Sequence, residues 1–179
     1  MTTDLPRRRL LALTACGALS GCGFQPVYMP TASGNAGPAQ RELAAIQVAL
    51  LPDRPGQLLR QALQDRFEMG SSGVAHRYDL TVTYWVSGEG IAVQTDNVAT
   101  RLRATGSAKW TLAAQDPAHT NLTSGSARSI DAINILDTQY FAADMELDAL
   151  YRRVADAVAD QIATQLATYF RKRAAVAAS

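Results

Sequence analysis

The residue with the clearest chemistry is a cysteine near the N-terminus. Cys22 follows the small residues Ser20 and Gly21, which is the pattern that lipoprotein processing needs before a cysteine. Three arginines at 7–9 and a short apolar run precede it, and this order is typical of an export signal. The sequence therefore predicts a lipoprotein signal peptide over residues 1–21. Acylation of the Cys22 thiol, palmitate included, would then anchor the chain to a membrane.

Other interpretations of this segment fit less well. Cys16 also follows small residues, but cleavage there would leave an apolar run of about six residues, below the roughly 7–15 of a signal core. The stretch from Leu10 to Leu19 is about half of the roughly twenty residues that a membrane-spanning helix needs. Arg7 and Arg8 leave the twin-arginine export route open beside the general one.

A second group with possible chemistry is a row of basic side chains on one predicted strand. Polar and apolar residues alternate from Val98 to Leu112, so Arg101, Arg103 and Lys109 share one side. Alternate residues of a strand lie about 6–7 Å apart, and guanidinium groups form charge-assisted bonds to phosphates and carboxylates. Such a row could bind an anionic ligand or an acidic partner. A solvated strand face would carry the same pattern.

An aromatic residue also falls on a polar strand face. Trp85 interrupts the alternation of the segment Tyr78–Val86, where even positions are apolar. Tryptophan is enriched at interface hot spots, so Trp85 is a candidate for partner contact. Simple packing at a sheet edge is the equal alternative.

The elements that would position these residues follow from hydrophobic periodicity. A helix opening at Pro55 would bury Leu59, Leu63 and Phe67, and residues 87–90 would form a turn. A final helix from Ala142 to Arg173 would have acidic residues in its first turns (Asp144, Glu146, Asp148) and basic ones in its last (171–173), as the helix dipole favours. The predicted strands are Ile46–Leu50, Tyr78–Val86, Val98–Leu112 and Leu122–Ile133.

This order predicts an α/β (α+β) two-layer sandwich. Its four-stranded mixed sheet would have two helices packed on one face and a polar face left open. Residues 22–40 would be the lipidated N-terminus and a flexible tether, because Pro30–Gln40 is small, polar and rich in Gly and Pro. A single domain would follow over residues 41–173, with a C-terminal tail over 174–179.

Composition and missing motifs argue against several classes. The net charge of +1 provides no field for nucleic acid. His76 and His119 have no cysteine or paired carboxylate at ligand spacing, so no metal site is predicted. No nucleophile elbow or phosphate loop is present. The sequence therefore predicts a protein that is not an enzyme and needs no cofactor; a periplasmic hydrolase is the weakest of the classes considered.

Two motifs and the order of elements resemble one family. The motifs are Cys-Gly-Phe-Gln-Pro-Val-Tyr at 22–28 and Tyr-Phe-Ala-Ala at 140–143, followed by Arg152 and Arg153. With the alternating strand pair, they are similar to the lipopolysaccharide-assembly lipoprotein LptE of Gram-negative outer membranes. The resemblance implies a two-layer α/β fold, a location on the periplasmic side of the outer membrane and a plug inside the β-barrel LptD. It also implies help in folding that barrel, lipopolysaccharide binding and delivery to the outer leaflet.

The resemblance also guides where the ligand would bind. In this family a basic residue would be expected near the tip between the two long strands, or in the loop before the last helix. Residues 87–97 and 131–148 contain no Lys or Arg. The expected contacts to lipopolysaccharide or to the barrel therefore fall on the strand face, with Arg101, Arg103, Lys109, Arg128 and Trp85. The alternative is an accessory lipoprotein of a periplasmic lipid-trafficking transporter, which would share signal, tether and domain.

Overall fold

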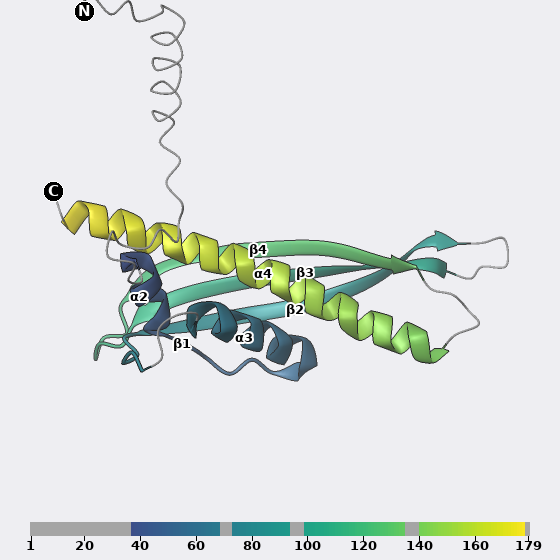
Figure 1. The fold of residues 1–179 in the computed structure, drawn as a ribbon, viewed down its shortest axis with the longest axis horizontal. Coiled ribbons are helices and arrows are strands. Elements are labelled where there is room, and N and C mark those ends of the chain that lie inside the picture. The colour runs from purple at the N-terminus through teal and green to yellow at the C-terminus, as the bar shows by residue number, and fades with distance from the viewer. Residues whose placement is uncertain (1–36, 69–72, 94–98, 135–139, 178–179) are drawn as a thin grey trace, which may run out of the picture.

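The computed structural model describes residues 37–68, 73–93, 99–134 and 140–177. The predicted signal peptide, Cys22 and the 22–28 motif lie outside these residues. The described chain forms one four-stranded sheet in the order β1-β2-β3-β4, with helices on one of its faces (Figure 1). The elements are α2 (Pro38–Ala44), β1 (Ile46–Val48), α3 (Asp53–Glu68), β2 (Tyr78–Val93), β3 (Ala99–Ala114), β4 (Asn121–Asn134) and α4 (Tyr140–Ala177).

The sheet is mixed, as the sequence predicts. The short β1 runs parallel to the first three residues of β2, whereas β2, β3 and β4 form a long antiparallel meander. The long helix α4 crosses this meander diagonally, and α3 lies beside it over β1 and the start of β2 (Figure 1). The predicted fold class is therefore confirmed, with a third helix, α2, added to the expected two.

The core forms between the sheet and the helices. Leu59, Leu63 and Phe67 of α3 are buried, as their spacing predicts. From α4, the side chains of Leu150, Val154, Val158, Ile162 and Leu166 are completely buried. Burying an aliphatic side chain of this size contributes about 1.5–3 kcal/mol. This apolar stripe therefore holds α4 on the sheet.

The N-terminal boundary of the domain differs from the prediction. Residues up to Gln40 were expected in a flexible tether, but α2 begins at Pro38 and buries Ala39 and Leu43. Proline suits the first turn of a helix, because its missing N–H has no partner there in any case. The predicted β1 is also shorter than expected, since Leu50 lies beyond its end and is 84% exposed.

The turn predicted at residues 87–90 is wrong. β2 continues through Gly88, Glu89 and Gly90, and these residues pair with Ala104, Arg103 and Leu102 of β3. Gly and Ser favour turns when nothing else decides. Here the hydrogen-bonded ladder with β3 keeps the segment extended.

The prediction that charged residues occupy the first and last turns of the final helix is also wrong. Because α4 runs from Tyr140 to Ala177, it has no acidic residue in its first turn and no basic residue in its last. Asp148 instead accepts hydrogen bonds from Arg54 of α3 at 2.8 Å and from Arg152 at 2.9 Å. The carboxylate therefore joins two helices; it does not cap one.

Ion pairs connect the elements of the helix layer to each other and to the sheet. Arg66 of α3 donates to Asp160 at 2.5 Å and to the Asp156 carbonyl oxygen at 3.1 Å, both on α4. The bond to Asp160 outweighs burial and raises the pKa of Arg66. Arg153 of α4 donates to Asp131 of β4 at 2.6 Å. These pairs orient α4 about its own axis, with Asp156 and Asp160 toward α3 and Arg153 toward β4.

Gly106 should be a position where even one methyl group destabilises the fold. A Cβ there would lie 2.5 Å from Val154 Cγ1 and 2.7 Å from the Tyr84 hydroxyl oxygen. We expect Gly106→Ala to lower the free energy of unfolding by about 1–3 kcal/mol, measured by urea denaturation. Gly88→Ala is the control, because its Cβ would meet Leu102 Cδ1 at 3.7 Å. Equal effects of the two substitutions would contradict this packing.

The Asp131–Arg153 pair should stabilise the protein only above acidic pH. Burial opposes ionisation of Asp131, but hydrogen bonds from Arg153 and the Ala132 N–H lower the pKa of the carboxyl below its ordinary value. A depressed pKa in the folded state means that this stability is present above about pH 4 and is lost as the pH falls further.

Asp131→Asn should therefore destabilise the protein at pH 7 and have a smaller effect at pH 3, in urea denaturation at both values. Glu146→Gln on the exposed surface of α4 controls for the loss of one charge. If Asp131→Asn lowers the free energy of unfolding by the same amount at both pH values, the stabilising role of the ionised Asp131 is contradicted.

Candidate partner-binding face

One side of the meander has no helix over it in the part of the chain that the structure describes. We call this side the open face. It consists of alternate residues of three strands, whose neighbours on the same strands point into the core. Its β3 members are Arg101, Arg103, Thr105, Ser107, Lys109 and Thr111, its β2 members include Thr83, Trp85 and Glu89, and its β4 members include Ser126, Arg128 and Ile130.

The alternation predicted for β3 is confirmed by burial. Ala104, Ala108, Trp110 and Leu112 are all buried beneath the helices, and the intervening residues occupy the open face. Because side chains of a strand alternate strictly between faces, this burial places every basic residue of β3 on the same side.

All five residues named as contact candidates from the sequence lie on the open face. Register pairs Trp85 with Ser107, and Ser107 with Arg128, so Trp85 and Arg128 flank β3 in one row. Lys109 lies in the next row, between Thr83 and Ser126. The structure therefore brings Trp85, Lys109 and Arg128 into one neighbourhood from three different strands.

Arg101 and Arg103 lie farther along β3, toward the β2–β3 connection. Arg103 donates to Glu89 across the strand pair at 2.6 Å. Both partners are largely exposed, at 42% and 65%, so the pair contributes little to stability. Among the described residues, Arg101, Lys109 and Arg128 form no ion pair. Their charges are available to an external anion.

The open face also carries apolar side chains that sequence analysis only partly identified. Trp85 is 46% exposed and Ile130 is 54% exposed. Ile130 pairs with Thr105, one row from Arg128. The less regular pattern of β4 hid Ile130 from sequence analysis, but its even spacing from Arg128 was a usable signal. The open face therefore combines cationic groups with two exposed apolar side chains.

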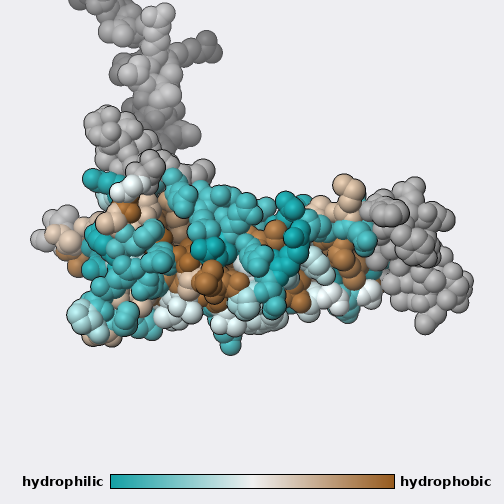
Figure 2. Space-filling view, turned by 90° about the horizontal axis from the view of Figure 1, so that it is seen from below, coloured by the Kyte–Doolittle hydropathy of each residue, from teal (hydrophilic) through white to brown (hydrophobic). Residues whose placement is uncertain are grey.

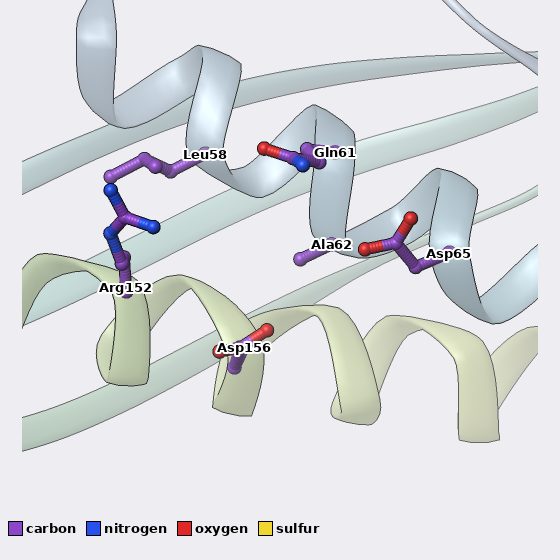
Figure 3. A pocket seen from close by; sticks show the side chains of 6 residues that line it. All are labelled: Leu58, Gln61, Ala62, Asp65, Arg152 and Asp156. Atoms are coloured by element: carbon purple, nitrogen blue, oxygen red, sulfur yellow. The ribbon is translucent and has the colours of Figure 1, made fainter. Parts of the chain in front are cut away.

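A polar cleft lies between α3 and α4 in the helix layer. It has a volume of about 170 Å³ and is lined by Leu58, Gln61, Ala62 and Asp65 of α3 and by Arg152 and Asp156 of α4 (Figure 3). Two of its charged groups already have partners, since Arg152 bonds to Asp148 and Asp156 accepts from Arg66. The cleft is part of the helix–helix junction.

Two kinds of feature are absent from the described ranges. No group of three or more His, Cys, Asp or Glu side chains there could hold a metal ion. No helix in those ranges has the length and hydropathy to cross a membrane. Both histidines, His76 and His119, are exposed.

The fold and the open face together define a small α+β domain with one helix-covered and one polar sheet surface. Solved structures share this fold. A putative lipoprotein from Caulobacter crescentus matches with a TM-score of 0.62 and 22% identity, over 74% of this chain and 96% of that one. Rare lipoprotein B from Shewanella oneidensis matches with a TM-score of 0.50 and 13% identity, over 69% and 92% of the two chains. At these identities the likeness concerns the fold alone.

A family model identifies the chain itself. The model described as LptE, lipopolysaccharide-assembly, matches residues 43–166, which span α2 to α4 and include the open face. The chain therefore belongs to the LptE family, as its motifs and element order predict. A search of curated proteins returned no match.

The basic residues of the open face should be dispensable for folding. We expect a variant with Arg101, Arg103 and Lys109 all replaced by serine to retain its free energy of unfolding within about 1 kcal/mol, because exposed charges contribute little. Circular dichroism and urea denaturation measure this. A loss of several kcal/mol would mean that these side chains support the sheet.

Proposed function

We propose that this protein is the lipid-anchored plug and assembly subunit of an outer-membrane lipopolysaccharide translocon. In this proposal Cys22 carries the lipid on the periplasmic side of the outer membrane. The domain assists folding of the LptD barrel and delivery of lipopolysaccharide to the outer leaflet. Membership of the LptE family and the lipoprotein signal pattern in the sequence support it. The role is one of binding and assembly, with no reaction catalysed.

The open face is the single observation that carries the proposal. A domain seated inside a barrel must present a structured polar surface, because the lumen of an outer-membrane barrel is itself polar. The open face meets this need, since it carries mainly Thr, Ser, Arg and Lys, while most apolar residues of its strands lie beneath the helices. Such a face is hydrated in the free protein, and contacts with the barrel wall can replace its contacts with water.

The mixed chemistry of the open face also suits an amphiphilic anion. Lipopolysaccharide carries phosphates on its saccharide, and Arg101, Lys109 and Arg128 can supply charge-assisted bonds to them. The exposed side chains of Trp85 and Ile130 lie in adjacent rows, where acyl chains or sugar rings can pack. Contacts of both kinds on one surface distinguish this ligand from a simple phosphate.

Removal of the basic groups should weaken ligand binding without unfolding the protein. We expect replacement of Arg101, Arg103 and Lys109 by serine to lower the affinity for lipopolysaccharide at least about tenfold, since each hydrogen bond to a charged group contributes about 1.5–3 kcal/mol. A matched control replaces Arg41, Lys172 and Arg173, which are exposed on the helix layer. Unchanged affinity in the open-face variant would overturn the assignment of this surface.

The cellular role has its own test. Depletion of the protein should reduce correctly assembled barrel and surface lipopolysaccharide, and the full chain should co-purify with a large β-barrel. Normal barrel levels and normal export after depletion would overturn the proposal. Co-purification with an inner-membrane transport complex would instead indicate an accessory lipoprotein of lipid trafficking.

A further inference from the structure

The two edges of the sheet differ in how their backbone groups are hydrogen-bonded. At the β4 edge, side chains of α4 satisfy the backbone: Gln161 donates to the Arg128 carbonyl oxygen at 2.9 Å and accepts from the Arg128 N–H at 3.2 Å. Gln165 donates to the Ser126 carbonyl oxygen at 3.0 Å. An unpaired edge is a template for pairing with another chain, and these glutamines occupy the middle of the β4 edge, at Ser126 and Arg128.

The β2 edge remains open over much of its length. β1 pairs only with Tyr78–Leu80, and the last backbone bond on that side joins the Ala49 N–H to the Leu80 carbonyl oxygen at 3.0 Å. Among the described residues, β2 has no strand partner on that side beyond Leu80. Even-numbered residues of β2 point their backbone groups to this side. The alternation of the ladder therefore leaves the N–H and C=O groups of Tyr84, Val86 and Gly88 facing outward.

The N-terminal part of helix α4 extends beyond this edge. It projects past β2 in the view onto the sheet (Figure 1), so that no described strand lies beneath it there. Leu147 and Tyr151 on this part of α4 and Val86 of β2 are only partly buried, and all three pack against the small cluster around Leu150. Seen from the side of α3 and β1, the molecule carries patches of hydrophobic surface (Figure 2). A further strand would extend the apolar layer beneath α4.

We propose that the β2 edge from Tyr84 to Gly88 accepts an extended segment of the barrel protein as an additional strand. The inference rests on the proposed function for the identity of the partner. The wall of a closed barrel has no free edge, so the strand must come from a loop or terminal segment within the lumen. Main-chain hydrogen bonds supply the affinity in such strand addition, and alternate side chains supply the specificity.

The surroundings define the sequence of the added strand. Side chains on its helix side would contact Val86, Leu147 and Tyr151, so they must be apolar. Side chains on its other side would continue the open face beside Trp85 and Glu89, so they must be polar or able to pack on an indole ring. The segment is therefore an alternating apolar–polar strand, continuous with the proposed partner-binding face.

Backbone exchange in the complex tests the proposal directly. Amides of Tyr84, Val86 and Gly88 should exchange with deuterium at least about tenfold more slowly when the full chain is bound to the barrel, because new hydrogen bonds protect them. The amide of Arg128, already bonded to Gln161, serves as the internal reference on the β4 edge. Unchanged exchange at the β2 edge in an intact complex would overturn strand addition and leave the proposed function standing.

A proline variant gives an independent readout. Gly88→Pro removes one outward N–H from an exposed edge position, where proline is tolerated, and Gly88→Ala is the matched control that keeps the N–H. Circular dichroism first establishes that the proline variant is folded. We expect its affinity for the barrel to fall at least about tenfold, and the alanine variant to bind the barrel with the affinity of the wild type. Normal binding of a folded Gly88→Pro would overturn the proposal. Failure of the wild type to hold any barrel would overturn both this inference and the proposed function.

Discussion

The structure depends on the close approach of one long helix to one face of the sheet. Alanines at 155, 159, 163 and 167 of α4 are all buried, and small side chains at this spacing let other elements approach the helix closely. On the strands, Gly106 makes room for Val154, and Gly125 makes room for the indole of Trp110. Interiors are packed as densely as organic crystals, so the small residues on both sides specify where α4 lies.

Coverage of a single face decides what the rest of the molecule can do. A strand that buries alternate side chains must present the others to its second face, and here those are mainly Thr, Ser, Arg and Lys, with Trp85 and Ile130 among them. The same helix also decides the edges, because Gln161 and Gln165 reach the backbone of β4, whereas no side chain of the described residues is bonded in this way to the end of β2. An open polar face and one open edge are thus two consequences of where α4 lies, and together they form one continuous surface for a partner.

The periodic parts of the fold were predictable from residue order. Leu59, Leu63 and Phe67 specify the buried side of α3, and strict alternation from Leu102 to Leu112 specifies both faces of β3. Predictions failed where local preference and tertiary contacts disagree. Gly88 and Gly90 favour a turn in isolation, but their ladder with β3 extends the strand. Asp148 is of a residue type that favours the start of a helix, but it instead binds arginines of two helices.

The sequence by itself therefore determined the class of fold, the family and the side of β3 on which the basic residues lie. These follow from periodicity and motifs, which are local properties of the chain. Only the tertiary structure decided that Trp85, Lys109 and Arg128 are neighbours and that Ile130 joins them. It also decided that side chains of α4 bond the middle of the β4 edge, whereas β2 has no strand partner beyond Leu80 on its outer side among the described residues. Register between strands and the azimuth of α4 set these features, and both depend on contacts between residues far apart in the chain.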